Sequence, residues 1–477
     1  MSAEASHESQ SPTQWLRQEA EGRWSAPAFF DRHCHPLFAT RELETINISQ
    51  CHSLEEIVST LCDYLQQNPE TTWLDAAPFD RNIDCDFVAS ELDVVSTRVP
   101  ITLHSSDHHA LWVNSAALEV AGLHQSVPKL RDAEVVCNPE GLATGMLLEW
   151  SAMKIMLDHM PMPTLEHDLE FLARAQDHLF AAGIVGVTDA WIDPGMGEVY
   201  VEADKRGLLR MPVELWVRIS PDDSVQQLVY LEQLRAMASN CPNVIVRGIK
   251  VFIDGVITSG TAALREGYLT IEAPASTIWS GKELEELLVK LSGISTTLRP
   301  HFHAIGDLAI SAALESISFA RSALLWRGPQ RPVLAHAEVV RASDCDLMAQ
   351  LDVEAAISPQ WLANRADYTR VLKRDACLKV GDFSGMLEAG VCLTYGSDWP
   401  VTPPNALSAI AEATKWLVGQ QKPLDEALEA AWRIASGPTW ASGASAINQP
   451  RVYFEENPLQ AAINDINALA DLNISLH

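Results

Sequence analysis

Side chains that can bind metal ions stand at the ends of several short apolar runs in this chain. The first run, Phe29–His35, ends in His33-Cys34-His35. Residues i and i+2 of an extended strand share one face, so the imidazoles of His33 and His35 can reach a single metal ion. The His-x-His pattern is weak by itself, because two unrelated loop histidines would produce it equally well. It indicates a metal site only if other ligands converge on the same place.

A later apolar run contains a lysine, which is uncommon. Lys250 stands within Gly248-Ile249-Lys250-Val251-Phe252. Burial of an unpaired ammonium group is costly, so either an ion pair or a chemical modification would explain this lysine. Three further runs end in candidate ligands and supply His301 with His303, then His336, and finally Asp398.

Eight β-rich runs alternate with helical stretches, and the candidate ligands stand at or just beyond their carboxyl ends. Such alternation predicts a parallel sheet, and eight strands close a (β/α)8 barrel, so the predicted fold class is α/β, a TIM barrel. Enzymes with this fold build their sites at the carboxyl ends of the strands. The predicted strands are Ala28–Asp31, Ile184–Thr188, Val213–Ile219, Val244–Ile253, Thr297–His303, Val333–His336, Glu354–Ile357 and Val391–Tyr395.

The gap between the first two predicted strands is too long for one helix. It predicts an insertion at about residues 37–163, with an extra strand at Val99–Leu103. Barrel and insertion together would cover residues 27–440. A polar N-terminal segment, residues 1–26, precedes them, and a C-terminal tail, residues 441–477, follows. The tail contains two candidate strands, Arg451–Phe454 and Ala468–Leu476.

Composition excludes several classes of partner. The 477 residues include 34 basic and 63 acidic side chains, a formal net charge of −29, which disfavours nucleic acid and anionic membrane surfaces. No apolar run approaches the roughly 20 residues of a membrane helix, and no secretory signal is visible. The 9 cysteines are scattered and never form a CxxC pair, as expected of reduced thiols in a cytoplasmic protein.

Motifs spread from Pro27 to about Ala435 follow one another in a familiar order. They are Asp31–Pro36, Asp107–Asn114, Thr144–Glu149, Lys250–Gly255 with Thr261–Leu264, His303–Asp307, His336-Ala337 and Gly396–Asp398. This series resembles the amidohydrolase superfamily. Within it, the chain is similar to the YtcJ-like group, also called amidohydrolase family 3, which includes N-substituted formamide deformylases. The resemblance implies a barrel that holds one or two divalent metal ions.

The resemblance also implies the metal ligands. His33 and His35 would bind the buried ion, and His303 and His336 would bind the more exposed one. Lys250, carboxylated on its amine, would bridge the two ions, because a carbamate turns the cation into a bidentate oxygen ligand. Zinc suits such ligands, with one or two ions per chain, and manganese or iron would also fit.

Further roles follow from the same resemblance. Glu149 competes with Lys250 as the bridging ligand, because a carboxylate needs no modification. Asp398 would bind the first metal ion and act as the general base. His109, together with Asn114, would reach over from the insertion and orient the carbonyl of the substrate.

These expectations describe a metal-dependent hydrolase that cleaves an amide-type C–N bond of a small molecule through a metal-activated hydroxide. A first alternative is a mononuclear enzyme that deaminates a ring or opens a cyclic amide or lactone. A second alternative is a non-catalytic descendant that serves as a binding module. The second is motivated by Ala335, which stands where the family usually has glutamate, and by the short chain ends.

The short ends have a structural consequence. Family members usually carry a β-sandwich built from about fifty residues at each end, so here the sandwich is predicted to be reduced or absent. Its loss would expose apolar barrel surface, and this favours a homodimer. His108 and Trp399 also depart from the family pattern, in which glycine and a small residue are usual.

Three tryptophans each follow a predicted strand. Trp191, Trp361 and Trp399 together predict an aromatic, largely apolar substrate pocket around the metal ions. His301 is expected one layer deeper in the barrel, as a hydrogen-bonded interior residue. Asp254 and Asp307 are expected either to anchor loops or to support the ligating histidines, with the second role slightly favoured.

Overall fold

The structure is a computed structural model, and it describes residues 15–19, 22–131, 133–269, 276–364, 368, 371–373, 380–437 and 450–476. Residues 438–449, which include the predicted boundary between barrel and tail, lie outside the described part, as do residues 1–14 of the N-terminal segment.

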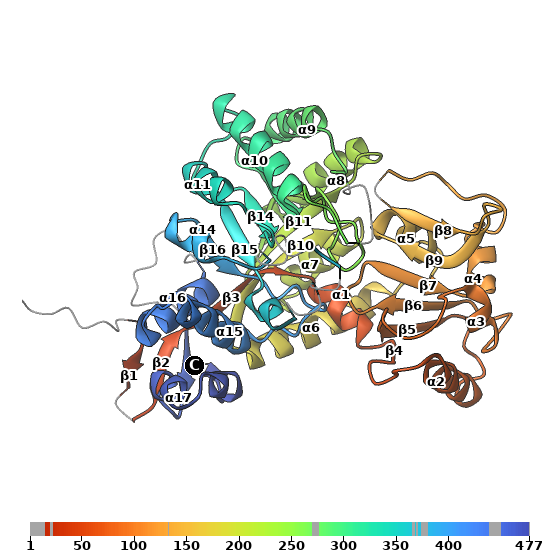
Figure 1. The fold of residues 1–477 in the computed structure, drawn as a ribbon, viewed down its shortest axis with the longest axis horizontal. Coiled ribbons are helices and arrows are strands. Elements are labelled where there is room, and N and C mark those ends of the chain that lie inside the picture. Colours follow the sequence, from red (N-terminus) through yellow and green to blue (C-terminus); the bar gives the residue numbers. More distant parts are fainter. Residues whose placement is uncertain are drawn as a thin grey trace, which may run out of the picture.

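Eight parallel strands form a nearly closed barrel at the centre of the molecule (Figure 1), which confirms the predicted fold class. Each strand pairs with the next along the chain, and the last strand contacts the first. Most predicted strand bounds agree with the structure to within a few residues, because buried parallel strands are continuous apolar runs. The strands are β3 (Phe29–Cys34), β10 (Ile184–Ile192), β11 (Val213–Ile219), β12 (Val244–Phe252), β13 (Arg299–Ala304), β14 (Val333–His336), β15 (Glu354–Ile357) and β16 (Cys392–Tyr395).

Helices pack around the outside of the barrel, and their apolar faces form the main core with the outer faces of the strands. The N-terminus of α9 (Gly281–Ile294) carries a complete capping box, in which Ser280 and Glu283 each accept a hydrogen bond from the other's main-chain N–H. The helices are α6 (Leu165–Ala181), α7 (Met196–Lys205), α8 (Ser224–Met237), α9 (Gly281–Ile294), α10 (Asp307–Ser322), α11 (Ala342–Gln350), α14 (Ser384–Glu388), α15 (Ala406–Gly419) and α16 (Leu424–Ser436). No helix in the described part of the chain combines the length and hydropathy needed to cross a membrane.

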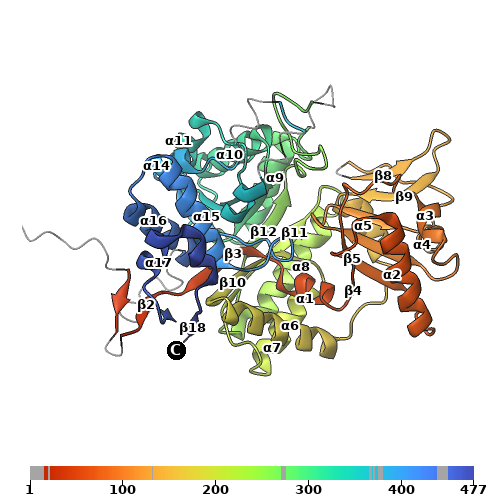
Figure 2. The same ribbon diagram turned by 60° about the horizontal axis from the view of Figure 1, so that its bottom comes forward.

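The insertion after β3 forms a separate lobe beside the barrel (Figure 2), with hydrophobic cores of its own. Its mixed sheet has the order β4-β5-β6-β7-β9-β8, and the extra strand expected near residue 100 is β6. The strands are β4 (Ile46–Asn47), β5 (Leu74–Phe79), β6 (Ile101–Ser105), β7 (Ala110–Val113), β8 (Glu134–Cys137) and β9 (Ala143–Leu148). The helices are α1 (Pro36–Glu42), α2 (Leu54–Gln67), α3 (Ala89–Asp93), α4 (Ser115–Val120) and α5 (Trp150–Leu157).

The two ends of the chain meet in a small antiparallel sheet on the other side of the barrel from this lobe. β2 (Trp24–Pro27) pairs with β17 (Arg451–Phe454), and β1 (Arg17–Gln18) and β18 (Ser475–Leu476) add one short edge each. β17 matches the first candidate strand of the tail, whereas the second begins in a 3-10 helix, Ile466–Asp471, and only its last two residues form a strand, β18. β2 was not expected, because a short strand that pairs with residues more than four hundred positions away leaves no local pattern.

Candidate active site

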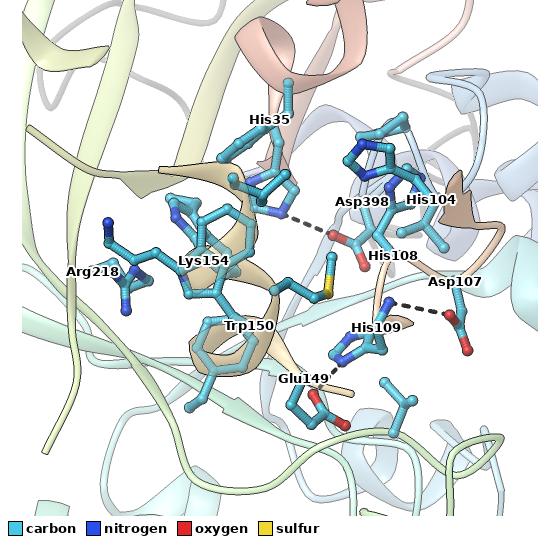
Figure 3. Close-up of a pocket in the computed structure, with 18 of the residues that line it drawn as sticks. His35, His104, Asp107, His108, His109, Glu149, Trp150, Lys154, Arg218 and Asp398 are labelled. Atoms are coloured by element: carbon cyan, nitrogen blue, oxygen red, sulfur yellow. Dashed lines mark hydrogen bonds and ion pairs between the residues drawn. The ribbon is translucent and has the colours of Figure 1, made fainter. Parts of the chain in front are cut away.

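Two imidazoles and one carboxylate meet at the carboxyl end of the barrel. His33, His35 and Asp398 each offer a ligand atom within 4.8 Å of the others. Among the described residues, no other three histidine, cysteine or acidic side chains bring their ligand atoms this close together. Both imidazoles turn Nε2 toward Oδ1 of Asp398, at 3.3 Å for His33 and 3.1 Å for His35. Figure 3 shows the contact of His35 with Asp398. The i and i+2 spacing does bring the two rings together.

The far nitrogen of each ring faces another buried side chain. Nδ1 of His33 lies 2.8 Å from Nε2 of His301, which occupies the barrel interior as expected. Nδ1 of His35 lies 3.7 Å from Oδ1 of Asp189 in β10, which is beyond hydrogen-bond range. Asp189 is also bound by the hydroxyl of Tyr200 and was missed by the sequence analysis. Such outer contacts leave the Nε2 atoms directed into the cluster.

Burial and neighbouring charges set the protonation of this cluster. Burial, reinforced by Lys250, lowers the pKa of His33 to about 3, so its imidazole is neutral. Burial alone would raise the pKa of Asp398, but hydrogen bonds from His33 and His35 hold it well below its usual range. The cluster therefore presents a neutral imidazole and an ionised carboxylate, which are electron-pair donors.

Lys250 lies next to this cluster on β12, with a side chain that is only 1% exposed. Its Nζ is 3.3 Å from Nε2 of His33 and 5.0 Å from the centre of the Phe252 ring. Burial lowers the pKa of Lys250 to about 7, despite the opposing charge of Asp398. A large share of this amine is consequently uncharged at neutral pH.

Two more histidines continue the line of rings. The His336 ring centre lies 4.8 Å from that of His33 and 4.6 Å from that of His303. His303 Nε2 is 3.2 Å from the carbonyl oxygen of Gly255. Burial lowers the pKa values of both His303 and His336 well below the usual value. Their rings are therefore neutral neighbours of the three-residue cluster.

The insertion contributes His109 and Glu149 to the same site. Nδ1 of His109 lies 2.6 Å from Oε2 of Glu149, and Oε1 of Glu149 accepts a hydrogen bond of 2.6 Å from the Thr261 hydroxyl of the barrel. Glu149 is thus engaged away from His33 and Asp398, and its role as an alternative bridging ligand stays a prediction. Burial lowers the pKa of His109, but the charge and hydrogen bond of Glu149 outweigh this and raise it to about 9.

Two residues assigned to the substrate do not reach the cavity. Asn114 is fully buried at the start of α4, where its side chain accepts from Ala117 and donates to the carbonyl oxygen of Ser96. Trp399 packs in the main core, with its ring centre 5.9 Å from that of His178. Asn114 serves as a helix cap, and Trp399 points outward because the chain reverses direction directly after Asp398.

The other two tryptophans do face the cavity. Trp361 stacks on His336 with ring centres 5.2 Å apart and planes at 7°. Trp191 lies edge-on to His35, at 6.2 Å. Both side chains line a cavity of about 1270 Å³ between the barrel mouth and the insertion, which also contains the metal-ligand candidates.

Buried carboxylates next to the site mainly hold loops. Asp254 accepts from the main-chain N–H groups of Ala263, Ile305 and Gly306, so it joins the loops after β12 and β13. Asp307 accepts from the N–H of Arg265. The expectation that these two residues support the ligating histidines was therefore wrong, because main-chain donors lie closer.

A nearly closed barrel with titratable side chains gathered at the carboxyl ends of its strands defines the class of (β/α)8-barrel enzymes. The chain belongs to the amidohydrolase family, whose model matches residues 18–447. This membership confirms the resemblance and supports a hydrolase.

Individual relatives are distant but cover most of the chain. An N-substituted formamide deformylase of Arthrobacter pascens is 25% identical over 451 residues, which span 89% of this chain and 80% of the relative. The protein LONG AFTER FAR-RED 3 of Arabidopsis thaliana is 24% identical over 420 residues, 83% of this chain and 69% of the relative. A solved metal-dependent hydrolase from Pyrococcus furiosus shares the fold, with a TM-score of 0.67 and 19% identity, and the match covers 92% of this chain and 88% of that one.

Proposed function

We propose that this protein is a metal-dependent hydrolase that cleaves an amide-type C–N bond of a small molecule. The observation that carries the proposal is the convergence of His33, His35 and Asp398 within 4.8 Å on the wall of a large cavity. A non-catalytic protein has no evident need to keep such a group at the mouth of a barrel. Membership in the amidohydrolase family supports the same activity.

The residues of the cluster fit a divalent metal ion. Two imidazole nitrogens and a carboxylate oxygen are ligands that zinc takes in catalytic sites, and manganese and iron accept them too. The ring of His33 is neutral, so it carries a lone pair that a metal ion can take, and Asp398 is ionised. His303, His336 and Lys250 would hold a second ion, with Lys250 carboxylated. The low pKa of Lys250 supports this modification, because only an uncharged amine can add carbon dioxide.

A bound divalent ion supplies Lewis-acid activation of water and of the scissile carbonyl. The chain supplies the remaining chemistry. Asp398 is ionised and lies against the cluster, so its carboxylate can accept a proton and return it to the departing nitrogen. His109 is protonated at neutral pH, and its Nε2 is not used by Glu149, so it can donate to the carbonyl oxygen as negative charge develops there.

The test combines elemental analysis of the purified protein with a hydrolysis screen of N-formyl, N-acyl and cyclic amides. We expect bound divalent metal and turnover of at least one acyclic amide. His35→Asn should lose both, whereas His124→Asn, which removes an exposed histidine of the insertion, should lose neither. A protein that binds no zinc, manganese or iron on titration would contradict the proposal. Turnover confined to ring amines, lactones or cyclic amides with one ion per chain would favour the mononuclear alternative.

A further inference from the structure

An arginine outside the metal cluster presents its guanidinium to the cavity. Arg218 stands at the carboxyl end of β11, and its side chain is 5% exposed. Its Nε donates to both carboxylate oxygens of Asp193, at 3.0 and 3.2 Å. Within the described part of the chain, neither terminal amino group of Arg218 has a hydrogen-bond acceptor. Arg218 lines the cavity (Figure 3), so the hydrogen-bonding capacity of this edge is available to a ligand.

The partner of Arg218 is itself fully engaged. Oδ2 of Asp193 also accepts a hydrogen bond of 2.9 Å from Nε1 of Trp191. Asp193 therefore holds the guanidinium through Nε and leaves the two terminal amino groups of Arg218 unbonded by it. Burying a cation is costly unless its hydrogen-bond donors are paired. Here the terminal amino groups of Arg218 border the cavity, where a ligand can pair with them.

A second donor lies at the same strand end. Gln227 of α8 is 7% exposed and lines the cavity. Its Oε1 accepts a hydrogen bond of 2.7 Å from the main-chain N–H of Ser220, two residues after Arg218. This contact orients the side-chain amide, whose nitrogen has no acceptor among the described residues. Arg218 and Gln227 thus offer only donors.

Aromatic rings connect this place to the metal cluster. The Arg218 guanidinium lies 5.5 Å from the ring centre of Trp191 and 5.8 Å from that of Trp150. Trp150 and Trp191 are edge to face at 4.4 Å, and Trp191 also contacts His35. A ligand whose reacting carbonyl lies at the cluster would therefore place an apolar body along these rings and its far end at Arg218.

We propose that Arg218, with Gln227, forms a subsite for a carboxylate group, so that the substrate is an amide with an apolar or aryl body and a carboxylate at its far end. A carboxylate matches the planar fork of a guanidinium and accepts two parallel hydrogen bonds from it. That the bound carboxylate belongs to a substrate rests on the proposed hydrolase function. The subsite itself is a binding property, which can be tested without turnover.

Calorimetric titration with a matched pair of probes tests the subsite directly. The intact metal-loaded protein is titrated with 3-phenylpropionate and with its neutral isostere 3-phenylpropionamide. We expect the acid to bind at least about tenfold more tightly than the amide, as charge-assisted hydrogen bonds are stronger. Equal affinities, or no binding of the acid, would overturn the proposal.

Two variants locate the source of the preference. Arg218→Lys keeps a cation beside Asp193 but loses the fork, and Arg218→Gln removes the charge. Both should lose the preference for the acid while metal content and melting temperature stay close to the parent values. Arg81→Gln is the matched control, because it removes another cationic side chain from the same cavity and should keep the preference. A preference that survives both Arg218 variants would place the carboxylate elsewhere, on the metal for instance, and would refute the subsite.

Formate release from 3-(4-formamidophenyl)propionate, which carries its carboxylate at the far end of an aryl body, and from its primary amide separates this inference from the proposed function. If the acid is the better substrate and Arg218→Lys removes the advantage, both stand. If only neutral amides are hydrolysed, the hydrolase remains and the carboxylate subsite is wrong. If nothing is hydrolysed by the parent but the probe preference depends on Arg218, the subsite stands and the proposed function fails.

Discussion

The main-chain N–H of Asp398 donates to the carbonyl oxygen of His33 over 2.7 Å, across the seam between the last and first strands of the barrel. A second bond from the N–H of His35 to the carbonyl oxygen of Trp399, at 2.9 Å, reinforces this contact. Asp398 has a positive φ of 57°, a backbone geometry that non-glycine residues seldom adopt. Closure of the barrel therefore brings the carboxylate and the two imidazoles together, and the site exists only when the seam is formed.

Replacement of Asp398 by asparagine tests its role in proton transfer. Asp398→Asn keeps the size of the side chain but cannot accept a proton, so turnover should fall by about 100-fold or more. We expect metal to stay bound, because the imidazoles of His33 and His35 remain. Steady-state kinetics and elemental analysis measure the two quantities. Asp307→Asn is the control, since this carboxylate is engaged with the main-chain N–H and the guanidinium of Arg265. Near-normal turnover in Asp398→Asn would disprove the assigned role.

Removal of metal should abolish activity and lower stability together. A ligand that binds only the folded state stabilises it by mass action, so a chelator should shift the melting temperature downward by several degrees. Addition of zinc, manganese or iron should restore both properties. Calorimetry and a hydrolysis assay on one preparation provide the measurement. Activity that survives the chelator would contradict a metal-dependent hydrolase, whereas a protein without activity whose melting temperature ignores the chelator would argue for the non-catalytic alternative.

Lys250 offers a direct test of the binuclear arrangement. Carboxylation adds one carbon dioxide, so the native protein should be about 44 Da heavier than its sequence. Acid should remove this mass, because protonation of the carbamate nitrogen breaks the C–N bond, releases carbon dioxide and restores the amine. Lys250→Met keeps the length of the side chain and its apolar stem but removes the amine, so it should reduce the metal content from two ions to one. Native mass spectrometry and elemental analysis check both. An unmodified Lys250 with two bound ions would favour Glu149 as the bridging ligand.

The pair of His109 and Glu149 predicts an alkaline limit to activity. The folded-state pKa of His109 is raised from 6.5 to about 9. The protonated ring therefore stabilises the fold fully below about pH 6.5, and this contribution is lost as pH rises through about 9. Because the donor is lost over the same range, kcat/KM should fall above about pH 9.

Glu149→Gln separates His109 from other groups that titrate at high pH. Without the carboxylate, burial would lower the pKa of His109, so the alkaline limb should move toward neutral pH. Asp107 also contributes to the raised pKa of His109, but Glu149 has the larger effect. If the alkaline fall in kcat/KM stays at the same pH in Glu149→Gln, a group other than His109 causes it.

Much of the barrel could be predicted because its signals are local. The strand 213–219 is buried along its whole length and consists of apolar residues apart from Glu214 and Arg218. The ligand candidates could be found because a histidine or a lysine inside such a run is energetically exceptional. The His-x-His spacing also carries geometry, and the structure does bring His33 and His35 together.

Other features depend on contacts that no local pattern reports. Asp189 lies within β10, and only its distance to His35 reveals its place beside the cluster. Asn114 looked like a substrate ligand, but its side-chain oxygen caps α4 and also accepts from the N–H of Ile101 in the neighbouring strand. Arg218 gave no sequence signal either, because its significance lies in the edge that Asp193 leaves open.

The contrast between Trp361 and Trp399 provides a matched test of the aromatic pocket. Trp361 stacks on His336 inside the cavity, whereas Trp399 is 7% exposed and packs in the core. Trp361→Ala should therefore reduce the preference for aryl over short aliphatic amides, with a modest effect on stability. Trp399→Ala removes a large buried side chain and should cost about 3–5 kcal/mol of unfolding free energy while leaving this preference unchanged.

Competition assays with paired aryl and aliphatic amides, together with denaturant unfolding, measure both effects. The two variants remove the same type of side chain just after two neighbouring strands, β15 and β16, so general damage to the fold would affect selectivity in both. If Trp361→Ala kept its selectivity while Trp399→Ala lost it, the orientation of the two rings would be the reverse of that described. If neither changed selectivity, the wall formed by Trp150 and Trp191 would remain as the surface that recognises the apolar body of the substrate, because these two rings lie between His35 and Arg218.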